Sequence, residues 1–143
     1  MLRLIFAFLI LVGTCNVSQA GDFKIEFSWE GLKLCNTGRP NLVSNPIFKV
    51  SGLPKGTVGI DFRLKDLNVP SFNHGGGWIE ISKDGKVASN SFKYKSPCPP
   101  NRKHRYQWTA KAKDKKGFSG KTLATATAIR QYPVSYTHLT LPT

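Results

Sequence analysis

The sequence has few acidic residues and no hydrophobic run long enough to span a membrane. Of 143 residues, 8 are Asp or Glu and 21 are Lys or Arg, which gives a formal net charge of +13 and a pI near 10.0. A chain of this length holds one domain of about 100–150 residues, so a two-domain enzyme is excluded. Hydrophobic residues make up 40% of the chain and aromatic residues 11%, enough for a packed core, which argues against global disorder.

The signatures of common enzyme classes are also missing. The chain contains no G-x-S-x-G elbow, no Walker A loop and no dinucleotide fingerprint. No HxH, HExxH or CxxC spacing indicates a metal site. A catalytic Cys98 paired with His104 would need a free thiolate, which a disulfide at Cys98 would remove. We therefore expect a protein that is not an enzyme and that uses no cofactor and no metal.

The N-terminal residues 1–20 have the pattern of a secretory signal peptide. Arg3 precedes an apolar run over residues 4–12, and small residues lead to a predicted cleavage site after Ala20. The run is shorter than the roughly 20 residues of a spanning helix, which makes a retained anchor the weaker alternative. Cys15 raises the alternative of a lipoprotein, but Thr14 is large for the position before a lipidated cysteine. We expect an exported protein, periplasmic or secreted.

The C-terminal residues 134–143 resemble the in-frame translation of a transposase adapter used to prepare sequencing libraries. The alternative is a natural tail, since its Val, Tyr and Thr favour strands. If the adapter interpretation is correct, the encoding nucleotides match the adapter. The expected domain is then 21–133, with 113 residues and a net charge of +12.

Two cysteines fall within residues 21–133. Cys35 and Cys98 are an even pair in a chain that we expect to be exported, and this predicts one disulfide formed in an oxidising compartment. Two free, buried thiols are the alternative.

Hydrophobic periodicity predicts an antiparallel, mainly β fold. Apolar and polar residues alternate over 23–30, 58–65 and 105–113, as in strands with one buried face. Shorter strands are expected at 47–50, 78–82 and 91–94, with turns at 53–56, 84–85 and 116–117. Residues 122–130 fit a strand or a short helix, and their Ala/Thr alternation favours the strand. These elements predict a compact β-sandwich with little helix.

Two segments have the composition of functional loops. Residues 66–77 end in three glycines, and residues 96–106 contain three prolines before a basic and aromatic cluster. Between them they carry Asp66, His74, His104 and Tyr106, a set suited to holding a phosphate group, and the glycine amides could add an anion nest. Two unrelated surface histidines are the alternative, because spacing alone does not bring the loops together.

Basic residues concentrate in one stretch. From Lys86 to Lys113 the chain has eight Lys or Arg and no acidic residue. One interpretation is a positive field that concentrates anionic ligands or docks the protein on an anionic membrane surface. The alternative is a set of ordinary solvated lysines.

The two loops resemble motifs of the phosphatidylethanolamine-binding protein family, in its bacterial Raf-kinase-inhibitor-like branch. Residues 66–70 resemble D-P-D-x-P with His74 after it, and residues 96–100 with 104–106 resemble the G-P-C-P-P and H-R-Y pair. Residues 45–46, 53–54 and 56–57 resemble the family's S-P and P-x-G-T landmarks. Leu67, Asn68 and Ser96 depart from these motifs, as do the glycines that follow His74.

The resemblance implies a β-sandwich with a small anion pocket lined by Asp66, His74, His104 and Tyr106. It does not carry over the ligand's identity, and kinase inhibition is not expected of an exported protein. We expect a binding protein for an anionic small molecule or phospholipid headgroup, with peripheral contact to an anionic membrane and no nucleic acid partner. The alternatives are an interaction protein, such as an inhibitor of a secreted protease, and a hydrolase that uses the histidines as acid and base.

Overall fold

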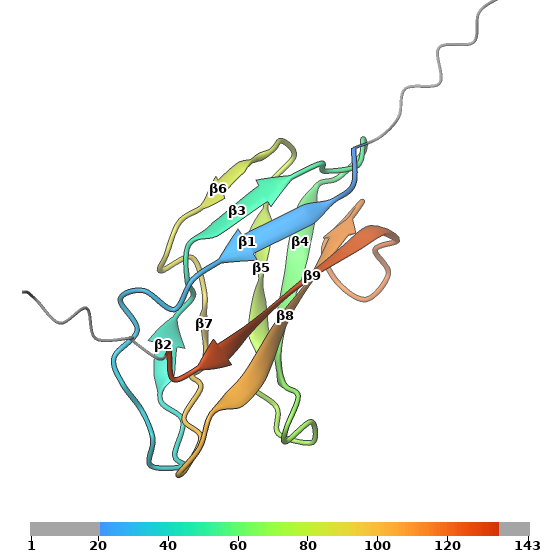
Figure 1. The fold of residues 1–143 in the computed structure, drawn as a ribbon. Coiled ribbons are helices and arrows are strands. Elements are labelled where there is room, and N and C mark those ends of the chain that lie inside the picture. Colours follow the sequence, from blue (N-terminus) through green and yellow to red (C-terminus); the bar gives the residue numbers. More distant parts are fainter. Residues whose placement is uncertain (1–20, 135–143) are drawn as a thin grey trace, which may run out of the picture.

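The computed structural model describes residues 21–134, so the signal-peptide prediction and nearly all of the adapter prediction lie outside the described residues. All regular elements in this part are strands (Figure 1). They are β1 (Lys24–Phe27), β2 (Leu42–Ser44), β3 (Phe48–Ser51), β4 (Gly59–Asp66), β5 (Gly76–Glu80), β6 (Gly85–Val87), β7 (Lys93–Lys95), β8 (His104–Lys113) and β9 (Thr122–Tyr132). Within residues 21–134, no helix is long and apolar enough to cross a membrane.

The strands form three antiparallel sheets. One has the order β1-β3-β6, a second pairs β2 with β7, and the largest has the order β5-β4-β8-β9. Figure 1 shows β1, β3 and β6 lying across the four-stranded sheet as a second layer. The predicted mainly β, antiparallel sandwich is therefore confirmed.

The core lies between these two layers. On β4, Ile60, Phe62 and Leu64 are buried, while the residues between them face outward or are only half-buried. Phe62 stacks on Phe48 of β3 with 4.4 Å between ring centroids, and Trp108 of β8 meets Phe48 edge to face at 5.2 Å. Each such buried side chain contributes about 1.5–3 kcal/mol by leaving water, so this aromatic cluster holds the sheets face to face.

The pairing of β4 with β8 positions the candidate residues. Asp66, the last residue of β4, lies opposite Tyr106 of β8, and His104 begins β8. β9 then pairs along the whole of β8, which fixes His104 opposite Tyr132. The predicted strands at 58–65, 105–113 and 122–130 are confirmed, and the last is a strand and not a helix.

Two strands were not predicted. β2 and β6 have three residues each, too few to show a period in the sequence. β6 begins at Gly85, where we expected only a turn.

Two of the three glycines at 75–77 have a packing role. Gly76 and Gly77 lie in β5, paired with Arg63 and Phe62 of β4. A Cβ atom on Gly77 would collide with the ring of Phe92, and one on Gly76 would collide with the carbonyl oxygen of Phe62. These glycines therefore permit close packing against β5, and none of the three lines the cavity described below.

Candidate functional site: a His–Asp cavity

Asp66 anchors the site at the end of β4. Its Oδ2 accepts a hydrogen bond from Nδ1 of His104 at 2.7 Å, and its Oδ1 accepts from the amides of Asn68 at 2.8 Å and Val69 at 3.1 Å. Burial alone would raise the pKa of Asp66, but the bonds from His104 and the two amides together lower it below its usual value of 3.8. Asp66 is therefore a buried carboxylate that closes the turn after β4 and orients His104.

His104 has one fixed nitrogen and one available nitrogen. Because the carboxylate of Asp66 accepts, Nδ1 of His104 carries the proton. Its Nε2 has no hydrogen-bond partner within the described chain. The imidazole is thus held in one tautomer and one orientation, with Nε2 left for a ligand.

His74 is also held through its Nδ1, in this case by the backbone of Lys95 in β7. Its Nδ1 donates to the backbone carbonyl of Lys95 at 2.8 Å, and its own carbonyl accepts from the amide of Lys95 at 2.8 Å. Burial lowers the pKa of His74, and this outweighs the opposing effects of the Lys95 carbonyl and the Asp66 charge. Its Nε2 also has no partner within residues 21–134. When neutral, His74 therefore offers an acceptor at Nε2, and when protonated it offers a donor.

Tyr106 lies behind the two histidines. Only 1% of its surface is exposed, and its ring meets His74 edge to face at 5.5 Å and stacks against His104 at 6.2 Å. Burial first, and the nearby Asp66 carboxylate second, raise the pKa of Tyr106, so its hydroxyl stays protonated. The structure thus brings Asp66, His74 and His104 to one wall and places Tyr106 beneath it as support.

These residues surround a cavity of about 220 Å³, which we call the His–Asp cavity. Its apolar lining comes from three loops. The lining residues are Gly38, Pro40, Asp66, Val69, Phe72, His74, Cys98, Pro99, Pro100 and His104. Phe72 meets His74 edge to face at 4.6 Å between ring centroids. The cavity is smaller than the roughly 300–1,000 Å³ of pockets for drug-sized ligands, so it suits a headgroup-sized molecule.

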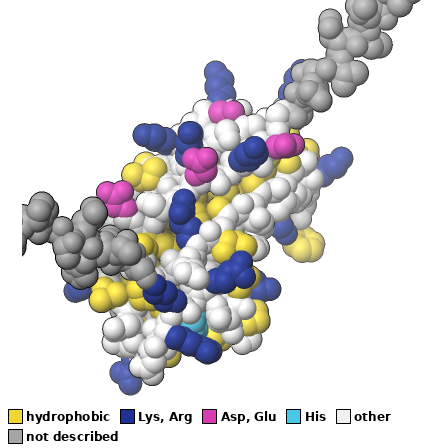
Figure 2. All heavy atoms as spheres, in the orientation of Figure 1, with side chains coloured by type: hydrophobic (Ala, Val, Ile, Leu, Met, Phe, Trp, Pro, Cys, Tyr) yellow, Lys and Arg dark blue, Asp and Glu magenta, His cyan; other side chains and the backbone are white. Residues whose placement is uncertain are grey.

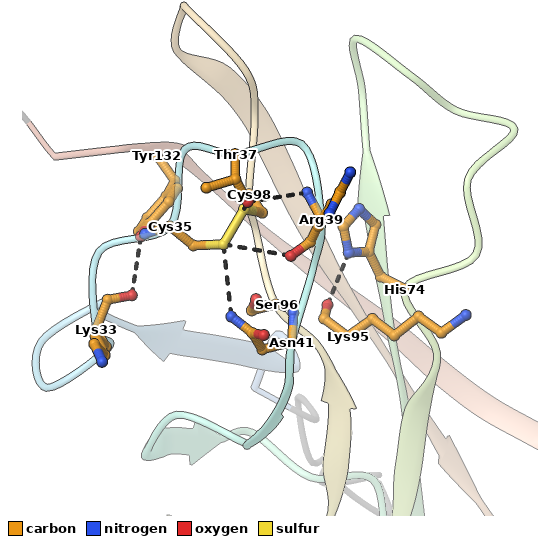
Figure 3. The surroundings of a disulfide bond; sticks show 10 residues. All are labelled: Lys33, Cys35, Thr37, Arg39, Asn41, His74, Lys95, Ser96, Cys98 and Tyr132. Atoms are coloured by element: carbon orange, nitrogen blue, oxygen red, sulfur yellow. Dashed lines mark hydrogen bonds between the residues drawn. A yellow bond between two sulfur atoms is a disulfide. The ribbon is translucent and has the colours of Figure 1, made fainter.

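A disulfide brings the third loop to the cavity. Cys35 and Cys98 are bonded, as expected, and the thiol alternative is wrong (Figure 3). The amide of Gly38 donates to the carbonyl of Cys98 at 3.1 Å, the amide of Ser96 donates to the carbonyl of Asn41 at 2.8 Å, and the amide of Asn41 donates to Oγ of Ser96 at 3.1 Å. Figure 3 shows this loop running past the disulfide beside the imidazole of His74. Disulfides persist in oxidising compartments, and the bond is consistent with one.

The sequence reasoning missed the contribution of Gly38 and Pro40. A signal was available, because Cys98 lies inside the proline-rich loop that carries the candidate site. A bond from Cys98 to Cys35 draws the residues after Cys35 to that same loop.

Basic side chains lie near the cavity, although its own lining contains Asp66 and no Lys or Arg. Lys95, whose carbonyl holds His74, places its Nζ 5.5 Å from the centroid of the Phe72 ring. In Figure 2 the acidic side chains visible on this face gather in its upper half, whereas a histidine in the lower half is flanked by Lys and Arg. The site therefore lies in a field that favours anions.

The titratable side chains that line the cavity are two histidines and one aspartate. Its lining contains no Ser, Thr or Lys, and its one cysteine is in the disulfide. Within the part of the chain that the structure describes, no three His, Cys, Asp or Glu side chains gather as a metal site would require.

The fold and the site together define a class: a small all-β sandwich with a recessed pocket of two histidines and an aspartate at the strand ends. No protein-family model matches the chain, and no curated protein matches its sequence. A solved structure with a similar fold is a protein from Chlamydia trachomatis described as a homologue of phosphatidylethanolamine-binding protein, with a TM-score of 0.53 at 17% identity. The match covers 80% of this chain and 99% of that one. The chain therefore has a fold of the phosphatidylethanolamine-binding protein type.

Proposed function

We propose that this chain is an exported, non-enzymatic binding protein for a small phosphate-bearing or otherwise anionic ligand, such as a phospholipid headgroup, in the His–Asp cavity. One observation carries the proposal: both imidazoles of the cavity have Nδ1 fixed by the protein and Nε2 free of partners within the described chain. Two oriented nitrogens on one wall form a two-point site for an oxyanion once they are protonated.

The role of Asp66 in this proposal is to position His104. Three hydrogen bonds already use its two oxygens, and the one from Nδ1 of His104 fixes the orientation of that imidazole. Tyr106 supports both rings from below. The ligand contacts are then made by His74 and His104, with the prolines and Phe72 excluding water around them.

Three further observations support the proposal. The order of the two loop motifs resembles that of the phosphatidylethanolamine-binding protein family, and the similar solved fold carries that description. The cavity lining contains no Ser, Thr or Lys and no free cysteine, which supports binding over turnover by those nucleophiles. The pattern of residues 1–20 and the disulfide favour export.

Calorimetric titration with inorganic phosphate and with phosphoethanolamine tests this function. We expect binding by the wild-type chain and a loss of about tenfold or more in affinity for both ligands in His104→Ala and in His74→Ala. A charged hydrogen bond is worth about 1.5–3 kcal/mol, or 10- to 150-fold. If phosphoethanolamine binds and free phosphate does not, the ligand is a headgroup and not the free anion.

Asp66→Asn and Asp61→Asn form a matched control pair on β4. Asp66 contacts His104, whereas Asp61 lies on the outer face of the sheet and pairs with Arg63 at 3.3 Å. We expect Asp66→Asn to weaken binding and Asp61→Asn to leave it unchanged. Equal affinity in wild type and in both histidine variants would contradict the proposal, and turnover of p-nitrophenyl phosphate lost in His104→Ala would show a hydrolase instead.

A further inference from the structure

The loop that joins β8 to β9 has an unusual composition for a hairpin connection. Residues 113–121, which we call the lysine loop, contain four lysines and one acidic residue, Asp114. Phe118 lies among these lysines and is the most exposed large apolar side chain in the described chain, with its whole side chain in solvent. Nothing in the fold requires an aromatic residue there, because Phe118 packs against no part of the core.

The lysine loop is held in shape by its own hydrogen bonds. The amide of Lys121 donates to Oδ1 of Asp114 at 2.7 Å, the amide of Gly120 donates to the carbonyl of Gly117 at 3.2 Å, and Nζ of Lys113 donates to that same carbonyl at 2.6 Å. A preordered loop loses little conformational entropy when it binds. Phe118 is therefore presented to solvent on a built support.

Positive charge and apolar surface continue beyond the loop. A groove of about 580 Å³ on the outer face of the four-stranded sheet is lined by Arg63, Lys111 and Lys116 together with the half-buried Trp78. Asp61 is the acid of this lining, and Arg63 pairs with it. At the right-hand edge of Figure 2, where Figure 1 places the loop, hydrophobic and basic side chains stand next to each other.

A neighbouring loop adds to the same end of the molecule. The amide of Val58 donates to the carbonyl of Lys113 at 2.8 Å, which places the segment between β3 and β4 beside the lysine loop. This segment carries the exposed Lys55, and Val58 is 49% exposed. Two loops thus present lysines and apolar side chains side by side.

We propose that the lysine loop is a membrane-docking element that binds the surface of a bilayer rich in anionic phospholipid. Phe118 enters the boundary between headgroups and acyl chains, the lysines around it contact the phosphate groups, and Trp78 lies at the interface where tryptophan is favoured. A soluble polyanion would use the lysines but give no reason for a fully exposed phenylalanine at the loop tip. This inference is separate from the proposed function, because the loop and His104 lie at opposite ends of β8.

Vesicle sedimentation with the full chain tests the inference, using vesicles of phosphatidylglycerol and phosphatidylcholine in equal parts and vesicles of phosphatidylcholine alone. We expect Phe118→Ala to lower affinity for the anionic vesicles about tenfold or more. We expect Lys115→Ala with Lys116→Ala to lower it about 25-fold at low salt, since each lysine near the surface contributes about fivefold. Lys33→Ala with Lys103→Ala removes the same charge from exposed positions at the other end of the molecule, near His104, and is the matched control.

The apolar residues 4–12 are the same in every variant and would contribute equally to vesicle affinity. The contribution of the lysine loop is therefore measured as the difference in vesicle affinity between the variants and the wild-type chain. A local readout comes from Phe118→Trp, whose blue shift on anionic vesicles we expect to exceed that of the wild-type chain with its three native tryptophans, whereas Leu42→Trp, on the exposed side of β2, shifts no more than wild type. Equal vesicle affinity for the loop variants and the lysine control would overturn the inference. Binding of the loop lysines to a DNA duplex, without a vesicle effect of Phe118→Ala, would also overturn it. Titration of the same variants with phosphate measures the affinity of the His–Asp cavity separately from vesicle binding.

Discussion

At the scale of single residues, the protonation of His74 controls what the cavity can bind. Nδ1 of His74 always donates to the carbonyl of Lys95, so a neutral ring presents a lone pair at Nε2, and an oxyanion needs a proton there. Burial lowers the pKa of His74 below 6.5, while the neighbouring charges of Asp66 and Lys95 oppose each other. Anion affinity should therefore fall as the pH rises, with the transition for this residue below pH 6.5.

Calorimetry with sulfate measures this pH dependence, because the charge of sulfate does not change between pH 5 and pH 8. We expect the affinity to fall by up to tenfold per pH unit and binding to take up protons, which appears as a dependence of the heat on the buffer. A sulfate affinity that is constant over this range at fixed ionic strength would contradict the role given to His74.

Asp66 makes a second prediction at this scale, one about stability. Its folded-state pKa is lowered, so its stabilising effect is present above the unfolded value of about 3.8 and is lost as the pH falls through the lower folded value. Asp66→Asn should lower the free energy of unfolding by about 1.5–3 kcal/mol at pH 7, the value of a hydrogen bond to a charged group. The difference from wild type should shrink below about pH 4.

Urea denaturation at pH 7 and pH 3 measures this effect. Asp61→Asn, which removes an acid from the exposed face of the same strand, should change stability by no more than about 0.5 kcal/mol. A deficit for Asp66→Asn that is the same at both pH values would show that shape, and not charge, explains the loss.

At the scale of elements, the disulfide joins stability to the shape of the cavity. Cys35 and Cys98 are 63 residues apart in sequence, and their bond holds Gly38 and Pro40 against the proline-rich loop. Replacing both cysteines with Ser should cost about 2–4 kcal/mol, mainly because the unfolded chain gains freedom. It should also weaken phosphate binding, because one wall of the cavity is released.

Thermal unfolding and phosphate titration of this double variant, with wild type reduced by dithiothreitol as a second form, check both effects. The control is Ser89→Ala, an exposed position outside the cavity. Unchanged phosphate affinity in a folded double variant would show that the 35–41 loop takes no part in the site.

Alternation over four or more residues predicted β1, β4 and β8, and β3, β5 and β7 were expected as shorter strands at 47–50, 78–82 and 91–94. The two-residue spacing of Ile25 and Phe27, and of Ile60 and Phe62, is enough to predict a buried face. β2 and β6 are strands because β7 and β3 lie beside them as pairing partners, and their own three residues carry no local pattern that would show it. Phe23–Glu30 likewise gave a longer strand than β1, because Trp29 is buried after the pairing with β3 has ended.

The candidate site was predictable in its residue types but not in its geometry. Motif resemblance supplied Asp66, His74, His104 and Tyr106. Which nitrogen each histidine keeps free depends on the Lys95 carbonyl and the Asp66 carboxylate, and these contacts follow from strand register. Tyr106 supports the histidine rings, whereas the other three residues line the cavity, and this difference also depends on packing.

At the scale of the whole molecule, β8 connects two surfaces for which we propose different functions. Its first residue, His104, lines the His–Asp cavity, and its last residue, Lys113, begins the lysine loop. Ten residues of extended strand separate them by about 30 Å. Under the two proposals, the excess of Lys and Arg has a role at both ends, as a field near the anion cavity and as headgroup contacts at the loop.

This separation predicts that the two surfaces act independently. Residues more than about 10 Å apart with no shared partner usually have additive effects, within about 0.5 kcal/mol or roughly twofold in affinity. We therefore expect Phe118→Ala to keep wild-type phosphate affinity and His104→Ala to keep wild-type affinity for anionic vesicles. The double variant should show both single losses unchanged. Titrating each ligand in the presence of the other measures the coupling directly, and more than about threefold would show that β8 transmits a change between the cavity and the loop.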